Sequence, residues 1–275
     1  MGRQDAAQFA ERFAPQTMFG LRGRTAFVSA APGHLGSAMA RVLGRAGAHV
    51  IVNARNDDKL RDFEHTLRDE GHSVERAAFD VADVNAARAF FASRARVDIL
   101  VNNAISMTPK PFAALEPSDF ATTYASSVTA TFEIVRAARN ALKAAADAAG
   151  EASVVNIASM YASVAPDARL YNERSQQSPF HYGPAKAALV QLTRHLAAEL
   201  GPEKIRVNAL LPGPFPRSEV HANDPAFAGR LAARTMLGRL GQQDEIAGPL
   251  LFLASPASSF MTGQALTVDG GWTAW

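Results

Sequence analysis

The sequence predicts an α/β protein with a doubly wound, mainly parallel, seven-stranded sheet and helices on both of its faces. Seven short runs are apolar at nearly every residue, and longer stretches with helical spacing separate most of them. A strand that is apolar on both sides must be covered on both sides, and parallel sheets meet this need with crossover helices. Ligands of such sheets bind beyond the carboxyl ends of the strands.

The positions of the elements follow from these patterns. The expected strands span residues 25–30, 49–54, 74–79, 98–103, 153–158, 205–210 and 265–268. The expected helices span residues 35–46, 57–70, 83–95, 117–146, 181–200 and 244–254. We interpret residues 1–275 as one domain, in which residues 1–17 form an arm with little packing potential.

Two of the expected helices carry apolar residues at a spacing of three and four, which predicts an apolar stripe on each. We expect most of these positions to pack in the core: Phe120, Tyr124, Val128, Phe132 and Val135 on one helix, and Ala185, Leu189, Leu192, Leu196 and Leu200 on the other. Ala187, Val190 and Ala198, on the other side of the second helix, could form a subunit interface.

The composition restricts the kinds of function. The net charge of the 275 residues is 28 − 26 = +2 and is spread along the chain, which argues against a nucleic-acid or membrane partner. No stretch resembles a signal peptide or a membrane span, so we expect a cytoplasmic protein. The lack of cysteine excludes disulfides and thiolate chemistry. The seven histidines show no paired metal spacing, so we expect no metal site.

The stretch SAAPGHLG, residues 29–36, follows the first strand and opens the first helix. Gly33 and Gly36 allow the backbone to approach a pyrophosphate closely, and the start of the helix offers free N–H groups. Asp80 ends the third strand and Asn102 ends the fourth, so both lie on the same rim of the sheet as the loop. Three such features on one rim favour a dinucleotide site over a simple turn.

The stretch HYGPAK, residues 181–186, indicates the chemistry, because Tyr182 and Lys186 are four residues apart and share a helix face. A lysine ammonium near a phenol favours the phenolate, and each unit of tyrosine pKa corresponds to about 1.4 kcal/mol. Such a tyrosine can exchange a proton with an alcohol oxygen near neutral pH, and Ser159 could polarise the same oxygen. A surface tyrosine beside a solvated lysine is the commoner origin of such a pair, but this pair lies at the expected ligand crevice.

Together with IRVNALLPG (205–213) and VDGG (268–271), these segments resemble the short-chain dehydrogenase/reductase family over nearly the whole chain. The resemblance implies a Rossmann-type fold, hydride transfer between a nicotinamide and a secondary alcohol or ketone, and a homodimer or homotetramer. It also implies that Tyr182 is the acid/base, that Lys186 binds the nicotinamide ribose and lowers the tyrosine pKa, and that Ser159 orients the substrate oxygen. The cofactor contacts that it implies, besides Tyr182 and Lys186, are Ser29, Gly33, His34, Leu35, Gly36, Asp80, Val81, Asn102, Ala104, Gly213 and Phe215.

The chain departs from the family pattern at several positions. Ala30 and His34 replace two glycines of the loop, and a requirement for positive φ at either would cost about 1–2 kcal/mol. We expect the loop to be re-threaded, with Gly33 supplying the flexibility and His34 facing solvent. Ile105 replaces a further glycine, and Ser127 aligns with the asparagine of the catalytic proton relay, where a serine would need an extra water.

The residues after the second strand bear on the choice of cofactor. An acid there would bind the ribose 2′-hydroxyl, but the chain has Ala54 followed by Arg55. An arginine can bind a 2′-phosphate with its planar fork, although it could also be a solvated loop residue. The sequence therefore favours NADP, with NAD possible.

The stretch between the serine and the tyrosine, residues 160–181, is about twice as long as the family's commonest form and carries a polar run at 172–177. Because its flanks are fixed, we expect it to bulge over the mouth of the site, with Met160, Tyr161 and His181 touching the substrate. A solvated loop of no consequence is the alternative. The polar run predicts a polar or sugar-like substrate.

The prediction is an NADP(H)-dependent oxidoreductase of secondary alcohols and ketones. The alternative, from another class, is a dinucleotide-binding sensor or scaffold with weakened catalysis, which the altered loop, Ile105 and Ser127 suggest. NADPH consumption with a panel of ketones discriminates between the two.

Overall fold

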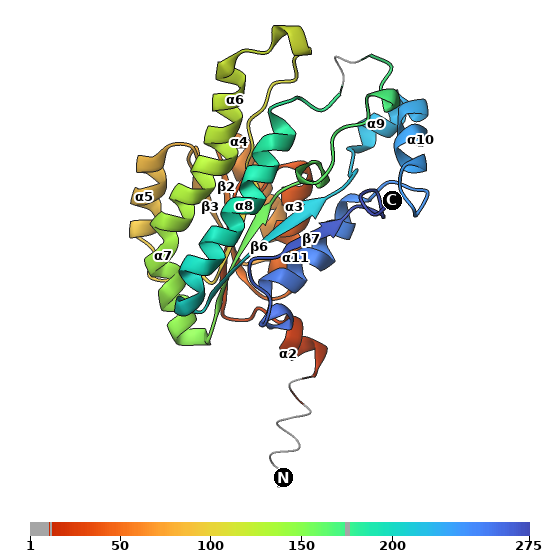
Figure 1. Cartoon of the computed structure of the whole chain (residues 1–275). Coiled ribbons are helices and arrows are strands. Elements are labelled where there is room, and N and C mark those ends of the chain that lie inside the picture. The colour runs from red at the N-terminus through yellow and green to blue at the C-terminus, as the bar shows by residue number, and fades with distance from the viewer. Residues whose placement is uncertain (1–10, 12, 174–176) are drawn as a thin grey trace.

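The computed structural model describes residues 11, 13–173 and 177–275. Seven strands form one sheet in the order β3-β2-β1-β4-β5-β6-β7, and every neighbouring pair is parallel (Figure 1). The strands are β1 (Thr25–Val28), β2 (His49–Ala54), β3 (Val74–Ala78), β4 (Ile99–Asn102), β5 (Ala152–Ile157), β6 (Ile205–Pro212) and β7 (Ala265–Val268). The predicted fold class is confirmed, and each strand lies within two residues of its predicted ends.

The strand order reverses beside β1, since the chain runs outward to β2 and β3 on one side and returns to β4 on the other. Connections that diverge at this point leave a crevice at the carboxyl ends of the strands. Adjacent residues of β1 point to opposite faces, so Phe27 and Val28 belong to two different cores.

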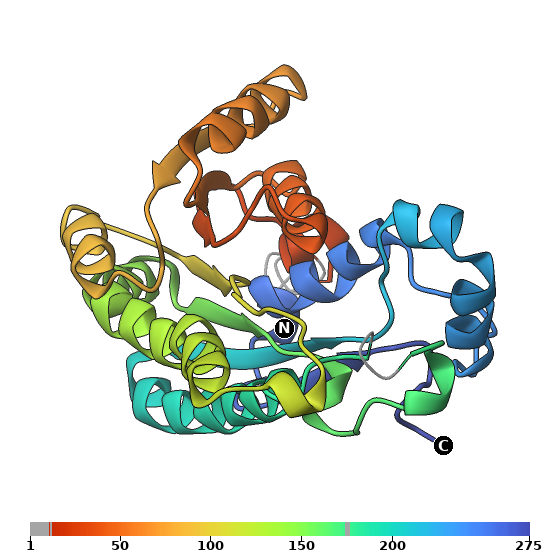
Figure 2. The ribbon, with the colours of Figure 1, turned by 90° about the horizontal axis from the view of Figure 1, so that it is seen from above.

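Helices cover both faces of the sheet (Figure 2). One layer holds α3 (His34–Arg45), α4 (Asp57–Asp69) and α11 (Ala247–Ala254), and the other holds α5 (Val84–Ala92), α7 (Ala130–Ala149) and α8 (Tyr182–Leu200). None of the helices in the described part of the chain is both long and apolar enough to cross a membrane.

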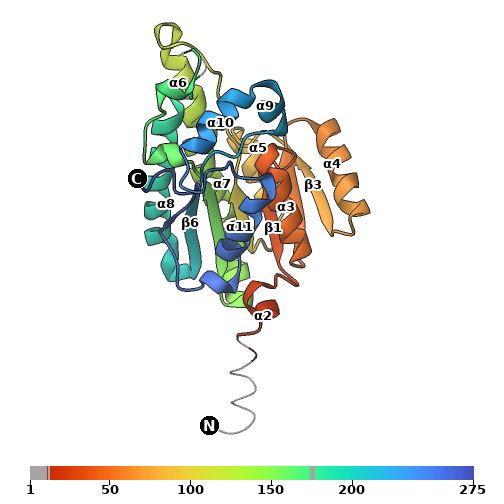
Figure 3. The same cartoon turned by 90° about the vertical axis from the view of Figure 1, so that its right-hand side faces the viewer.

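Three short helices were not predicted: α2 (Pro15–Phe19), α9 (Ser218–Asn223) and α10 (Pro225–Ala233). The part of the predicted arm that the structure describes therefore includes a helix, which begins with a proline at a favourable position (Figure 3). α10 also begins with a proline, and Asp224 caps it by accepting a hydrogen bond from Phe227 N at 2.8 Å. α9 and α10 lie above the carboxyl ends of the strands (Figure 3). α2 and α9, of five and six residues, have too few turns to show an apolar period.

The long helix predicted over residues 117–146 is interrupted. α6 (Pro117–Tyr124) passes into a π-helical turn, η2 (Ala125–Thr129), before α7 begins. The apolar stripe expected to pack in the core here does so only in part: Phe120 and Phe132 are 38% and 40% exposed, Tyr124 and Val128 are partly buried, and Val135 is buried. Small residues such as Ala130 face the sheet instead, because they let the helix lie close to it.

The stripe on α8 does pack inward, apart from partly buried Leu192. On the other side of α8, Ala187 and Ala198 are exposed but Val190 is buried.

The glycine loop is held in a strained conformation. Ala30 has a φ of 49°, in the left-handed region, while Gly33 has an ordinary φ of −68°. Gly33 is needed for space, because a Cβ there would lie 2.9 Å from the Ala30 carbonyl oxygen. Asn103 holds the turn, donating from Nδ2 to the carbonyl oxygens of Ser29 at 3.1 Å and Ala30 at 3.3 Å. The expectation that Gly33 supplies flexibility is therefore wrong, and Ala30 is the strained residue.

Replacing Ala30 with glycine should stabilise the protein. Relief of a left-handed alanine gains about 1–2 kcal/mol, and the extra freedom of glycine in the unfolded chain offsets about 0.5–1 kcal/mol of it. We expect the free energy of unfolding in urea to rise by up to about 1 kcal/mol for Ala30→Gly. Ala31→Gly is the matched control and should lose stability, because Ala31 is buried and is not among the positive-φ residues. Equal losses in both variants would contradict the assignment of strain to Ala30.

Candidate active site

A cavity of about 390 Å³ lies at the carboxyl ends of the strands where the order reverses. Its lining comes from the glycine loop, the ends of β2 and β3, the segment after β4 and the segment before α9: Ala30, Pro32, Gly33, Asn53, Ala54, Arg55, Asn56, Lys59, Phe79, Asp80, Val81, Ala104, Ile105, Ser106, Ser126 and Arg217. We call this the rim cavity. Five of the predicted cofactor contacts line it, namely Gly33, Arg55, Asp80, Val81 and Ala104.

The backbone around the rim cavity suits a dinucleotide. A Cβ at Gly36 would lie 2.4 Å from the Ala30 carbonyl oxygen, so the helix can start this close to the loop only with glycine there. α3 begins at His34 without a side-chain cap, which leaves its first N–H groups for an anion. The residues present therefore fit a pyrophosphate at this helix start.

Two predicted cofactor contacts, Ser29 and Asn102, have partners within the protein, although Asn102 Oδ1 has none among the described residues. The hydroxyl of Ser29 is buried, accepts from the N–H groups of Asn103 at 2.8 Å and Ala104 at 3.0 Å, and donates to the Val101 carbonyl. Asn102 is buried and donates its side-chain N–H to Asn156 on β5 at 2.8 Å. These hydrogen bonds join β1, β4 and β5. Because neighbouring strands lie close together at this rim, both side chains bind groups of an adjacent strand rather than extending into the cavity.

We expected His34 to face solvent, and the structure contradicts this expectation. Its Nε2 is buried without a hydrogen-bond partner in the described residues, and its ring lies against the backbone of Phe215 and Pro216. Burial lowers the pKa of His34, and the charge of Arg217 lowers it further. The side chain at this position therefore joins the glycine loop to the segment after β6, which the sequence pattern did not indicate.

Basic residues gather at the end of the rim cavity that lies beside β2 and β3. Arg55 is 68% exposed and lies 3.6 Å from the Asp80 carboxylate. Lys59, in the first turn of α4, lines the same cavity. Sequence reasoning missed Lys59, and the spacing gave no signal because Arg55 precedes the helix. No acidic residue from the end of β2 lines this cavity in the described part of the chain.

Three predicted site residues come together where β5 ends and α8 begins: Ser159, Tyr182 and Lys186. Lys186 is almost completely buried and donates from Nζ to the carbonyl oxygen of Ile157 at 2.6 Å. The same Nζ lies 5.8 Å from the centre of the Tyr182 ring. Ser159 follows β5 directly and accepts a hydrogen bond from Tyr161 N at 3.2 Å.

The electrostatics of this trio differ from the expectation in one respect. Burial raises the pKa of Tyr182, and a hydrogen bond from Ser159 acts in the opposite direction without outweighing it. Burial also lowers the pKa of Lys186, to about 7. The expected lowering of the tyrosine pKa by the lysine is therefore not found here, because Lys186 is itself desolvated and bound to a carbonyl oxygen.

Ser127, the predicted relay residue, lies in the π-helical turn η2, which packs against α8. It is buried, and its hydroxyl has no hydrogen-bond partner among the described residues. Its carbonyl oxygen accepts from Thr131 Oγ1 at 2.6 Å. A buried hydroxyl without a partner is what a relay through an internal water requires.

The insertion at 160–181 is fastened to α10 rather than solvated. Arg230 donates to the Leu170 carbonyl at 2.6 Å and to Asn172 Oδ1 at 2.9 Å. Met160 and Leu170 pack in one apolar cluster with Trp272. Residues 174–176 of the predicted polar run lie outside the described residues.

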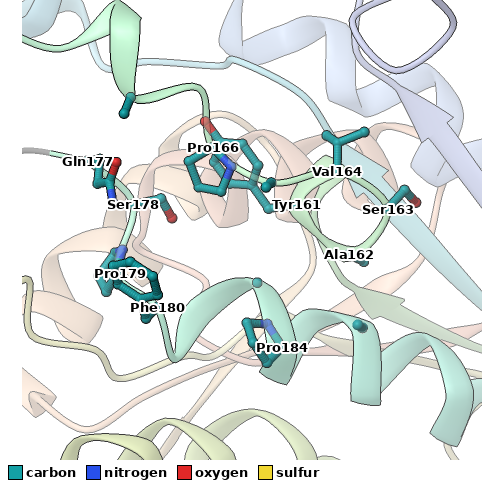
Figure 4. Close-up of a pocket in the computed structure, with 14 residues that line it drawn as sticks. Tyr161, Ala162, Ser163, Val164, Pro166, Gln177, Ser178, Pro179, Phe180 and Pro184 are labelled. Atoms are coloured by element: carbon teal, nitrogen blue, oxygen red, sulfur yellow. The ribbon is translucent and has the colours of Figure 1, made fainter. Parts of the chain in front are cut away.

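Beside the catalytic trio the insertion encloses a hollow of about 640 Å³ (Figure 4). Its walls are mostly apolar, with Val164, Pro166 and Phe180 among them, and the polar run contributes Gln177. Tyr161 lines the hollow and stands edge-on to Tyr182, with 6.5 Å between ring centres. Neither Ser159 nor Tyr182 lines it. The insertion is polar in composition, but the surface that it presents next to Ser159, Tyr182 and Lys186 is mostly apolar.

His181 was expected to touch the substrate, but it is completely buried. Both ring nitrogens have partners, Thr123 Oγ1 at 2.9 Å and the Thr108 carbonyl oxygen at 3.3 Å. No atom of the ring is left for a substrate, because α6 and the segment after β4 close over it.

Comparison with known proteins places this geometry in a family. The model described as Enoyl-(Acyl carrier protein) reductase matches residues 30–273. The gluconate 5-dehydrogenase of Gluconobacter oxydans is 34% identical over 263 residues, which cover 93% of this chain and 97% of that protein. The rhamnolipids biosynthesis 3-oxoacyl-[acyl-carrier-protein] reductase of Pseudomonas aeruginosa is 34% identical over 258 residues, covering 92% and 97%.

A solved structure shares the whole architecture. The gluconate 5-dehydrogenase from Burkholderia cenocepacia, in complex with NADP and tartrate, superimposes with a TM-score of 0.83 at 34% identity and covers 95% of this chain and 100% of that one. The family model, which matches residues 30–273, spans the segment from the glycine loop through Ser159, Tyr182 and Lys186 to the last strand. The chain therefore belongs to the short-chain dehydrogenase/reductase family of oxidoreductases.

Proposed function

We propose that the protein is an NADP(H)-dependent oxidoreductase that interconverts a ketone and a secondary alcohol. The observation that carries the proposal is the meeting of Ser159, Tyr182 and Lys186 at the carboxyl ends of the strands, beside a cavity suited to a dinucleotide. The bound nicotinamide would supply the hydride for reduction or accept it in oxidation.

Tyr182 is the proposed proton donor to the substrate oxygen in reduction. Burial raises its pKa, so the phenol carries its proton at neutral pH. Ser159, which is already close enough to hydrogen-bond the phenol, would bind the same substrate oxygen. As the proton leaves, the charge on the phenolate is stabilised by Lys186 one turn away, whose pKa of about 7 lets it gain a proton near neutral pH. The free hydroxyl of Ser127 is the proposed route by which a water returns the proton.

The proposal of NADP rests on Arg55 and Lys59, two cations at the end of the rim cavity beside β2 and β3. Both can reach toward a 2′-phosphate there, and Arg55 can present two N–H groups at once. The structure from Burkholderia cenocepacia, described above as a complex with NADP, supports this choice.

For the substrate we propose a polar, sugar-acid-like ketone or alcohol. Support comes from the two gluconate 5-dehydrogenases among the relatives, whereas the 3-oxoacyl reductase and the apolar hollow favour an acyl chain. NADPH consumption with keto-acid sugars and with 3-oxoacyl thioesters decides between the two. Tight NADPH binding without turnover of any ketone would instead favour the sensor or scaffold.

We also propose a homodimer or homotetramer. The exposed apolar residues Phe120 and Phe132 on α6 and α7, and Ala187 and Ala198 on α8, support this assembly. Sedimentation analysis measures its size.

Tyr182→Phe should leave NADPH affinity almost unchanged and lower kcat at least about a hundredfold, because proton transfer by a positioned group contributes about 10²–10⁴-fold. NADPH oxidation with the best ketone and a fluorescence titration of NADPH measure the two effects. Tyr124→Phe on α6 is the control and should keep full activity. Full activity of Tyr182→Phe would show that another group supplies the proton.

Arg55→Ala should weaken NADPH binding and spare NADH. Loss of one charge-assisted hydrogen bond costs about 1.5–3 kcal/mol, which corresponds to roughly a tenfold to hundredfold rise in Kd. Arg61→Ala is the matched control, because Arg61 lies on α4, pairs with Asp57 and does not line the rim cavity. Equal losses of affinity for both cofactors would show that Arg55 does not contact a 2′-phosphate.

A further inference from the structure

We propose that His181 is a positioning residue: it locks the start of α8, and with it Tyr182, to the wall of the rim cavity. The catalytic consequence rests on the function proposed above, while the structural link can be tested without it. Neither the cavity lining nor the catalytic trio includes His181.

The contacts of His181 join three segments that are distant in sequence. Its Nδ1 faces Thr123 Oγ1 on α6, and its Nε2 faces the carbonyl oxygen of Thr108 in the segment after β4. Its ring stands edge-on to Phe120, with 5.9 Å between ring centres. Tyr182 is the next residue in the chain. A single buried ring therefore connects the residue before the catalytic tyrosine both to α6 and to the segment after β4.

The hydrogen bonds of this link determine which nitrogen carries the proton. A carbonyl oxygen only accepts, so Nε2 carries the hydrogen that reaches Thr108. In the neutral ring Nδ1 is an acceptor for the hydroxyl of Thr123, whose single hydrogen is also directed at a backbone carbonyl oxygen. That hydroxyl also lies 3.1 Å from the carbonyl oxygen of Ser106, which Ser126 Oγ approaches to 3.3 Å. Removing the ring would leave the Thr108 carbonyl oxygen without this donor, while the Thr123 hydroxyl would keep only the carbonyl oxygen of Ser106.

The segment held by His181 forms part of the site. Ala104, Ile105 and Ser106 line the rim cavity, and Thr108 lies two residues after Ser106. Loss of the link would let this wall and the tyrosine move relative to each other. A displacement of about 1 Å near reacting atoms can cost about a hundredfold in turnover.

Other contacts keep the same segment in place, so variants of His181 should still fold. Lys110 pairs with Asp119 on α6 at 2.7 Å, and Phe112 packs against Phe180 in a tilted arrangement with 4.9 Å between ring centres. Lys186 remains bound to Ile157, so the next turn of α8 keeps its place on β5. The expected defect is thus local to Tyr182.

Three variants of His181 test the link, with His195→Ala, an exposed position on the same helix, as the matched control. His181→Ala removes both hydrogen bonds, His181→Asn keeps a polar atom near Nδ1, and His181→Gln keeps one near Nε2. For His181→Ala we expect kcat to fall about tenfold to a hundredfold, with the Kd for NADPH changed less than about twofold. Asn or Gln should recover part of kcat, and Thr123→Val combined with His181→Ala should cost less than the sum of the two.

Hydrogen exchange gives a readout that needs no turnover. The backbone amides of residues 106–110 and of the first turn of α8 should exchange faster in His181→Ala than in the wild type or His195→Ala. Unchanged exchange together with unchanged kcat overturns the proposal. Parallel losses of kcat, NADPH affinity and thermal stability without recovery by Asn or Gln also overturn it, since they assign a general structural role. If the wild type reduces no ketone, the proposed function is wrong. The hydrogen-exchange comparison alone then tests whether His181 connects these segments.

Discussion

A lysine enclosed in the protein interior is the constraint on which the site depends. Lys186 is almost completely buried, and its Nζ is satisfied by the carbonyl oxygen at the end of β5. This bond brings α8 against β5, so Tyr182 and Ser159 meet at the rim of the sheet. A buried ammonium lowers stability, and a strongly shifted pKa in a cleft is typical of a group that takes part in chemistry. The same dry surroundings keep the phenol of Tyr182 protonated.

The cofactor end of the cleft shows how a sheet rim can tolerate an altered loop. Ala30 takes the left-handed turn at an energetic cost, and Asn103 holds it through two carbonyl oxygens. The glycines that remain, Gly33 and Gly36, provide space rather than unusual φ. His34 stands in the place of a further glycine, and its ring lies near the backbone of Phe215 and Pro216, in the segment before α9.

The sheet, its strands and the trio were predictable from the sequence, because apolar runs and the spacing of Tyr182 and Lys186 are local patterns. Phe120 and Phe132, two residues of an apolar stripe, were misassigned to the core, since periodicity identifies a stripe but not the side that it faces. The direction of the Tyr182 pKa was also wrong, because burial is a property of the folded chain. The roles of Ser29 and His181 depend on partners more than fifty residues away, which no local pattern contains.

The central physical claim is that burial of Lys186 destabilises its charged form, and the pH dependence of the free energy of unfolding tests this claim directly. The lysine pKa falls from 10.5 in the unfolded chain to about 7 in the folded protein. Between these two pKa values the unfolded chain binds the lysine proton and the folded protein does not, so the loss of folding stability decreases as the pH rises. The full loss is present below pH 7 and disappears toward pH 10.5. The measurement is the free energy of unfolding of the wild type and of Lys186→Met across this range. The account predicts that the methionine variant is more stable at pH 6 and that the difference shrinks steadily as the pH rises above 7. A difference that stays constant with pH would contradict it.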